Sequence, residues 1–251
     1  MSHLPGKFVW FECVTHDLPR AQRFYGEVLG WKVEAFPMGS TTYPLIKAGD
    51  TAVGGYVPLS DTRTAPHWIS SLSVDDVDAT ARAVTAAGGT VLEPPADLPP
   101  VGRSAKIADP FGTQLYLFRA AGADAADGPP TSGRFYWNEL WTRDAGVALA
   151  FYETVIGYTH SDMDLGPQGT YRVLEKGGVP RGGIMTSPRS DAPPMWLPYV
   201  AVGDCDATVT RAGKLGGAVV AAPDDLPGVG RFAILADPAG ATFAVIKPAP
   251  R

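Results

Sequence analysis

Residues 8–31 read FVWFECVTHDLPRAQRFYGEVLGW, and residues 135–158 read FYWNELWTRDAGVALAFYETVIGY. These segments lie 127 positions apart, and 10 of their 24 aligned residues are identical. A second pair is more similar: residues 95–112 (PADLPPVGRSAKIADPFG) and residues 223–240 (PDDLPGVGRFAILADPAG) share 12 of 18 residues at an offset of 128. Internal similarity at a nearly constant spacing is typical of a tandem repeat. The chain therefore contains two homologous halves.

The stretch AAGADAADGPPT, from Ala120 to Thr131, lies between the two halves. Its residues are small or polar and rich in proline and glycine, which is typical of a linker. We predict a first domain over residues 1–119, a linker over residues 120–133 and a second domain over residues 134–251.

The same order of elements is predicted in each half. Residues 7–15 alternate in side-chain character and are rich in β-forming residues, which predicts a strand. Asp17 follows as a helix N-cap, apolar residues recur at intervals of three and four, and Gly30 ends the helix. The remaining predicted elements of the first half are strands near 43–48, 53–58 and 67–74, a helix ending at Ala87, and strands near 90–93, 103–108 and 113–119. Each half thus reads as strand, helix and strands, twice over, so the chain is α+β with four modules.

Composition limits the partners and the location of the protein. The chain has 251 residues, of which 45% are hydrophobic and 19% charged, so it can form a packed core. Because 21 Lys+Arg stand against 26 Asp+Glu, there is no basic excess to neutralise phosphates, and we expect no nucleic-acid or membrane partner. No signal-peptide or membrane-spanning segment is recognisable, and Cys13 and Cys205 form neither a zinc spacing nor a disulfide framework. We expect a cytoplasmic protein.

Two signatures recur in both halves. An Asp precedes a helix that contains Phe-Tyr and ends in Leu-Gly or Ile-Gly, and Asp-Pro-x-Gly precedes the last strand at residues 109–112 and 237–240. These residues resemble the vicinal oxygen chelate superfamily, which includes glyoxalase I, bleomycin-resistance proteins and extradiol dioxygenases. The Trp-x-Glu strand and the Val-Gly-Arg segments are similar to a two-domain, glyoxalase-like subgroup typified by mycobacterial secreted antigens. The resemblance implies four βαβββ modules, paired into two open eight-stranded barrels that each surround a cavity.

The resemblance also implies a divalent metal held by His and Glu on the inner strands. The aligned positions of this chain hold other residues: Trp10, Trp137, Ile69, Leu197, Tyr116 and Ala244. Indole and alkyl side chains do not ligate metals. We therefore expect no metal cofactor. The alternative is a metal site in the first half that uses His67, two residues before Ile69.

Two glutamates are the predicted catalytic residues. Trp10 and Glu12 share one strand face, recur as Trp137 and Glu139, and by the resemblance line the cavity. A carboxylate among aromatic rings loses hydration, and this loss disfavours its charged form and suits a general base. Glu12 and Glu139 are therefore candidate acid–base residues for proton transfer next to a carbonyl group.

Further residues are candidates for binding the substrate. An aromatic box for a planar or cationic ligand would consist of Trp10, Trp137, Tyr43, Tyr171, Trp68, Trp196 and Tyr116. The alternative for each of them is ordinary core packing. Arg103 and Arg231 are candidates for binding a substrate carboxylate. Alternatively, they pair with the glutamates, which would leave a poor base, or fix their loops against Asp97 and Asp225.

These residues suggest three candidate functions. The first is a glyoxalase-like lyase or isomerase that acts on a small carbonyl compound without the usual metal. The second is non-catalytic small-molecule binding of the bleomycin-resistance type; a protein-interaction module is a third alternative. Because Val14 is replaced by Trp141, we expect the two cavities to differ. Fusion of two homologous halves predicts a monomer with pseudo-twofold symmetry, with a homodimer as the alternative.

Overall fold

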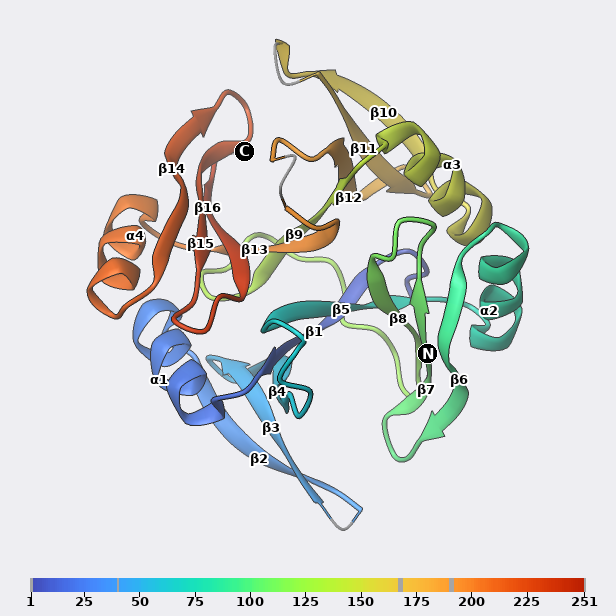
Figure 1. Cartoon of the computed structure of the whole chain (residues 1–251), viewed down its shortest axis with the longest axis horizontal. Coiled ribbons are helices and arrows are strands. Elements are labelled where there is room, and N and C mark those ends of the chain that lie inside the picture. The colour runs from blue at the N-terminus through green and yellow to red at the C-terminus, as the bar shows by residue number, and fades with distance from the viewer. Residues whose placement is uncertain (1, 40, 167–168, 190–191, 251) are drawn as a thin grey trace. The chain divides into compact units, whose positions relative to one another are not determined.

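The computed structural model describes residues 2–39, 41–166, 169–189 and 192–250 (Figure 1). The first half contains β1 (Phe8–Thr15), α1 (Leu18–Leu29), β2 (Lys32–Met38), β3 (Thr41–Ala48), β4 (Thr51–Pro58), β5 (His67–Ser73), α2 (Val77–Ala86), β6 (Thr90–Leu98), β7 (Gly102–Ala108) and β8 (Gln114–Ala120). The second half contains β9 (Phe135–Thr142), α3 (Ala145–Ile156), β10 (Thr159–Asp164), β11 (Thr170–Lys176), β12 (Val179–Thr186), β13 (Met195–Ala201), α4 (Cys205–Lys214), β14 (Ala218–Leu226), β15 (Gly230–Ala236) and β16 (Thr242–Pro248). Each half therefore has two modules of one strand, one helix and three strands, which confirms the predicted α+β fold.

The strands form two eight-stranded mixed sheets with the same order. One runs β2-β3-β4-β1-β5-β8-β7-β6 and the other β10-β11-β12-β9-β13-β16-β15-β14. Parallel pairs such as β1 with β4 and β5 with β8 occur beside antiparallel hairpins. This topology confirms the fold that the resemblance implied.

The edge strands differ most from the prediction. Sequence periodicity did not indicate β2 or β10, because their side chains are mostly or wholly exposed and show no apolar alternation. Strand β6 is longer than predicted and continues to Leu98, with register shifts between Val91 and Ala96 that interrupt its pairing with β7. Such bulges are common on strands at a sheet edge.

The helix boundaries follow local signals. The Asp17 side chain accepts a hydrogen bond from the backbone N–H of Arg20, and Gly30 ends α1 in the left-handed region at φ 74°. Asp144 and Gly157 do the same for α3. Glycine tolerates that backbone conformation without the steric cost of a Cβ atom, so these predicted caps are confirmed. None of the described helices is long and apolar enough to cross a membrane.

The contacts divide the chain into two compact units. The middle unit contains Met1–Trp10, Ile69–Asp127 and Trp137–Trp196, and the terminal unit contains Phe11–Trp68, Gly128–Tyr136 and Leu197–Arg251. Each unit combines one module of the first half with one of the second. The predicted division at residues 120–133 follows the repeat, and it stays a prediction.

A buried hydrogen-bond chain joins the two modules of the terminal unit. Trp68 Nε1 donates to the Tyr25 hydroxyl at 2.9 Å, and that hydroxyl donates to Asp237 Oδ2 at 3.2 Å. The other oxygen of Asp237 accepts the backbone N–H groups of Ala239 and Ala241. Burial raises the pKa of the Asp237 carboxyl above its ordinary value. The Phe-Tyr and Asp-Pro-x-Gly signatures therefore meet in the core, although they come from different halves.

The middle unit repeats this chain. Trp196 Nε1 lies 3.1 Å from the Tyr152 hydroxyl, which lies 3.5 Å from Asp109 Oδ2. Trp196 is buried, as is its counterpart Trp68 in the terminal unit. For these two tryptophans the structure favours the packing alternative over a place in an aromatic box.

Candidate functional site

In the terminal unit, Glu12 and Tyr43 form a hydrogen-bonded pair on one sheet face. Glu12 lies on β1 beside Gly55 of the parallel strand β4, and Tyr43 lies on β3, which pairs with β4 on its other side. The Tyr43 hydroxyl crosses β4 and donates to Glu12 Oε1 at 2.5 Å. Both side chains are half-buried, so the pair combines a proton acceptor and a proton donor that keep some solvent exposure.

A glycine makes this pairing possible. A Cβ atom on Gly55 would lie 2.0 Å from the Tyr43 hydroxyl oxygen, and one on Gly54 would lie 2.1 Å from the backbone oxygen of Phe11. Any side chain at position 55 would therefore displace Tyr43 from the carboxylate. The two glycines allow the Phe11 backbone and the Tyr43 side chain to lie close to β4, as expected for glycine within a strand.

The middle unit holds the second copy of this arrangement, in which two tryptophans are donors. Tyr171 lies over Gly183, which is the register partner of Glu139. Here Trp137 Nε1 donates to the Tyr171 hydroxyl at 2.7 Å, and Trp141 Nε1 donates to Glu139 Oε1 at 2.6 Å. Glu139 is only 7% exposed, whereas Glu12 is half-buried. The two glutamates therefore occupy different environments.

The two arginines that recur in both halves bind neighbouring aspartates. Arg103 donates through Nε and Nη2 to Asp78 at 2.7 and 2.9 Å, and through Nη1 to Asp97 at 2.8 Å. Arg231 repeats this arrangement with Asp206 and Asp225. The alternative that these arginines fix their loops is the one that the structure favours.

The arginine contacts also lower the pKa of the carboxyl groups they bind. Hydrogen bonds from Arg103 hold the pKa of Asp78 below its ordinary value, and those from Arg231 do the same for Asp206. A charge-assisted, bidentate contact of this kind favours the ionised carboxylate.

Three other residues singled out in the sequence lie on β1, β8 and β5. Trp10 and Tyr116 are half-buried, and Lys106 Nζ lies 5.7 Å from the centre of the Tyr116 ring. His67 begins β5, and its Nδ1 lies 2.9 Å from the backbone oxygen of Ala65. Sequence reasoning did not single out Lys106, although its spacing across the β7–β8 hairpin would have placed it opposite Tyr116.

Cys13 lies away from the glutamate face. Alternation along β1 places it on the opposite face from Glu12, and it is fully buried with Tyr25 among its neighbours. Burial raises the pKa of its thiol well above the ordinary value. Since the thiolate is the nucleophilic form, Cys13 is a core residue rather than a nucleophile.

The donor groups do not suit a divalent metal. Within residues 2–39, 41–166, 169–189 and 192–250, no group of three or more His, Cys, Asp or Glu side chains could hold an ion. Tyr43 and Trp141 already donate to the two strand glutamates. A catalytic zinc site, by comparison, normally needs three protein ligands.

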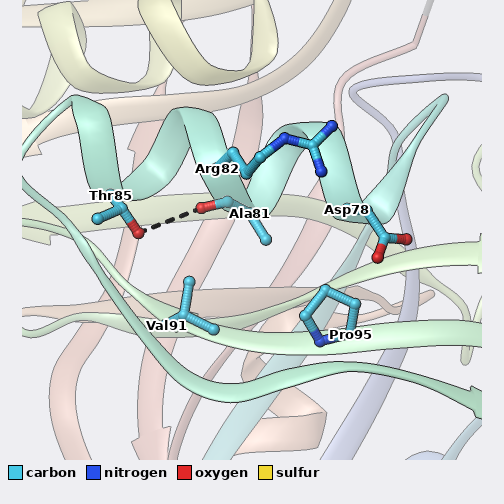
Figure 2. A pocket seen from close by; sticks show the side chains of 6 residues that line it. All are labelled: Asp78, Ala81, Arg82, Thr85, Val91 and Pro95. Atoms are coloured by element: carbon cyan, nitrogen blue, oxygen red, sulfur yellow. Dashed lines mark hydrogen bonds between the residues drawn. The ribbon is translucent and has the colours of Figure 1, made fainter.

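The hollows in the middle unit lie elsewhere. One of them, with a volume of about 260 Å³, lies between α2 and β6. Figure 2 shows Val91 and Pro95 facing the helix and the Thr85 hydroxyl donating to the backbone oxygen of Ala81. Its lining residues are Asp78, Ala81, Arg82, Thr85, Val91 and Pro95. A second hollow of about 430 Å³ is lined by Asp97, Pro99, Pro100, Gly102, Arg103, Arg119, Ala120 and Ala121. Neither brings reactive groups together beyond the arginine–aspartate contacts, so the Glu12–Tyr43 pair stays the better candidate.

Two domain families match the chain. Residues 7–43 match the family described as bleomycin resistance protein-like N-terminal, and residues 138–246 match the glyoxalase-like domain. Over 247 residues the chain is 39% identical to "Putative glyoxylase CFP32" of Mycobacterium bovis (strain ATCC BAA-935 / AF2122/97), covering 96% of this chain and 95% of that protein. It is also 33% identical over 260 residues to the anthracycline biosynthesis protein DnrV of Streptomyces peucetius, covering 97% and 94%.

Solved structures share the fold. The Mn(II)-bound glyoxalase from Novosphingobium aromaticivorans superposes with a TM-score of 0.65 at 20% identity and covers 100% of this chain and 89% of that one. The 2,2',3-trihydroxybiphenyl 1,2-dioxygenase from Sphingomonas wittichii strain RW1 gives a TM-score of 0.66 at 15% identity, with coverages of 98% and 91%. At these identities the likeness concerns the fold alone.

Proposed function

The chain belongs to the vicinal oxygen chelate superfamily as a glyoxalase-like protein, and from that premise we propose that it binds a small carbonyl compound and moves a proton with Glu12. The observation that carries this proposal is the Glu12–Tyr43 pair, held across Gly55 on a half-buried sheet face. Because many functions share this fold, the proposal rests on the site rather than on the architecture.

The proposed step is a proton transfer next to the carbonyl group. The Glu12 carboxylate takes a proton from the carbon beside the carbonyl, the C–H bond breaks, and its electron pair moves onto the carbonyl oxygen to form an enolate. For an α-hydroxy carbonyl compound, the proton of the α-hydroxyl group then moves to the former carbonyl oxygen. Return of the abstracted proton to the former carbonyl carbon completes an isomerisation, so no external oxidant or reductant is needed. Tyr43 holds the carboxylate in place throughout. Positioned bases of this kind typically contribute about 10²–10⁴-fold in rate.

The superfamily implies a divalent metal, and the side chains of this chain do not fit one. Trp10 and Tyr116 stand at two of the ligand positions that the resemblance implies, and indole and neutral phenol groups are poor ligands. We therefore derive no step through a metal. That the protein works without one stays a prediction, which elemental analysis of protein purified without chelators would test.

Proton exchange in heavy water tests the proposed step. The full chain is incubated in D₂O with dihydroxyacetone, acetoin or 1-tetralone, and loss of the α-proton signals is followed by NMR. We include an aryl ketone because two relatives are named anthracycline biosynthesis proteins. We expect exchange above the buffer rate for at least one ketone, and a loss of about 100-fold or more in Glu12→Gln.

Glu139→Gln is the matched control. Glu139 is nearly fully buried and accepts the Trp141 indole N–H, so we expect its substitution to leave the exchange rate within about threefold of wild type, where threefold corresponds to about 0.7 kcal/mol. Equal exchange by wild type and Glu12→Gln, with both folded by circular dichroism, would contradict the assignment of Glu12.

Non-catalytic binding is the second candidate. In the middle unit, the polar groups around Glu139 already have hydrogen-bond partners within the protein. The Trp137 indole donates to Tyr171, and the Trp141 indole donates to Glu139. A pure binder would show a rise in the unfolding temperature with added ligand and no exchange above the buffer rate. That combination would favour binding over catalysis.

A further inference from the structure

A half-buried lysine lies beside an aromatic ring on the second module of the first half. Lys106 on β7 is the register partner of Tyr116 on β8, and its ammonium group lies 5.7 Å from the ring centre. The Lys106 side chain is 22% exposed. We propose that Lys106 and Tyr116 form a binding site for a planar aromatic acid, with the ammonium group holding the anionic oxygen and the ring holding the planar body. This inference rests on the proposed function in one respect, that the protein binds a small molecule.

The alternation of β7 settles which face carries the lysine. Arg103 reaches Asp78 of α2, and Ala105 and Ile107 are buried on that same face. Lys106 therefore points to the face turned away from α2. The site and the arginine–aspartate contacts lie on opposite faces of one sheet.

Small hydroxyl side chains surround the pair. Ser71 on β5 is the register partner of Tyr116, and Ser104 lies two residues before Lys106 on β7. Both serines are buried and share the face of Lys106 and Tyr116. They offer hydrogen-bond donors beside the ammonium group and occupy little space.

The fourth module shows that the fold does not require this polar set. The corresponding positions hold Tyr199, Phe232, Ile234 and Ala244, with the same register pairs of Ile234 with Ala244 and Tyr199 with Ala244. The rings of Tyr199 and Phe232 are 6.3 Å apart, so aromatic packing occupies the positions of the two serines. Since one module is stable with apolar residues here, a lysine and two serines in the other point to a ligand.

The charges around Lys106 leave room for an anion. Glu93 of β6 is its register partner on the other side, and the two charged groups are 3.9 Å apart with the Glu93 side chain 60% exposed. Exposed pairs at such distances typically contribute less than about 1 kcal/mol. An ammonium group has three donors, so it can bind an anionic oxygen while it keeps Glu93 as a neighbour. A cation within about 6 Å of a ring also attracts the ring's face, which holds the lysine stem in place.

Matched anionic and neutral probes test the site. Binding of 1-naphthoate and of its neutral isostere 1-naphthamide to the full chain is measured by calorimetry. We expect wild type to prefer the acid by about tenfold, which corresponds to about 1.4 kcal/mol. Lys106→Met removes the preference by weakening the acid alone, Lys106→Arg retains it, and Tyr116→Leu weakens both probes.

Lys47→Met is the control for loss of a half-buried strand lysine. Lys47 is 21% exposed and lies 3.4 Å from Glu34 on a neighbouring strand, so it matches Lys106 in burial and pairing. We expect this variant to prefer the acid as wild type does. Equal binding of the two probes by wild type, no binding of either, or an unchanged preference in Lys106→Met would each overturn the proposal.

The proposed proton transfer can fail independently. Glu12→Gln leaves Lys106 and Tyr116 in place, so it retains the preference for 1-naphthoate even if it has lost α-proton exchange. If the protein prefers the acid but exchanges no ketone protons, the result supports the Lys106–Tyr116 site and contradicts the proposed proton transfer.

Discussion

Trp141 Nε1 lies 2.6 Å from Glu139 Oε1, two residues along the same strand and on the same face. The corresponding residue of the first half is Val14, which has no donor, and there Tyr43 donates to the glutamate instead. The two halves therefore keep the carboxylate, and Trp141 gives the second glutamate a donor that Val14 cannot give the first. This difference separates a nearly closed carboxylate in the middle unit from a more accessible one in the terminal unit.

Removal of the Trp141 donor should destabilise the protein. In Trp141→Phe a smaller aromatic ring remains and the N–H is lost, and a buried carboxylate that loses a donor costs about 1–3 kcal/mol. We expect a fall of that size in the free energy of unfolding measured in urea. In the background of Glu139→Gln the same substitution should cost less, since a neutral amide depends less on the indole N–H. Equal costs in the two backgrounds would show that the hydrogen bond adds nothing beyond ring packing.

Local signals in the sequence account for the modules. Asp17 and Gly30 lie at the two ends of one helix, and each acts through atoms within a few residues of itself. The repeat then transfers the same boundaries to Asp144 and Gly157. The sequence alone is therefore sufficient to predict the fold and the ends of these helices.

The partners of the site residues were not accessible in this way. Glu12 and Tyr43 were each recognised, but their hydrogen bond depends on β3, β4 and β1 lying side by side with a glycine between them. Tyr25 and Asp237 are 212 residues apart and meet only because the first and fourth modules share one unit. For Arg103 the sequence suggested a substrate carboxylate, a glutamate or Asp97; Asp97 is one of its partners, and the other, Asp78, depends on the placement of α2. Contacts between distant strands and modules produce no local pattern in the sequence, so these partners cannot be predicted from it.

Two buried tyrosines of the terminal unit should respond in opposite ways to loss of the hydroxyl. The Tyr25 hydroxyl bonds to Trp68 and Asp237, whereas the buried Tyr56 hydroxyl has no hydrogen-bond partner among the residues that the structure describes. We expect Tyr25→Phe to lower the free energy of unfolding by about 1–3 kcal/mol, and Tyr56→Phe to leave it unchanged or raise it by up to about 1 kcal/mol. Thermal and urea unfolding of the two variants would measure this. A loss in Tyr56→Phe as large as that in Tyr25→Phe would mean that the hydroxyl of Tyr56 has a partner, such as an internal water.

Asp237, the buried aspartate that accepts the Tyr25 hydroxyl, should make the free energy of unfolding depend on pH. Burial raises the pKa of Asp237 above the ordinary 3.8, so its contribution is present below that pH and is lost as pH rises through the folded-state value. The stability difference between wild type and Asp237→Asn should therefore shrink as pH rises above 4. Asp78→Asn is the control of opposite sign, because Arg103 lowers the pKa of Asp78 and its contribution is lost as pH falls. Urea unfolding at a series of pH values measures both, and a difference for Asp237→Asn that grows with pH would mean that the charged carboxylate is the form the fold prefers.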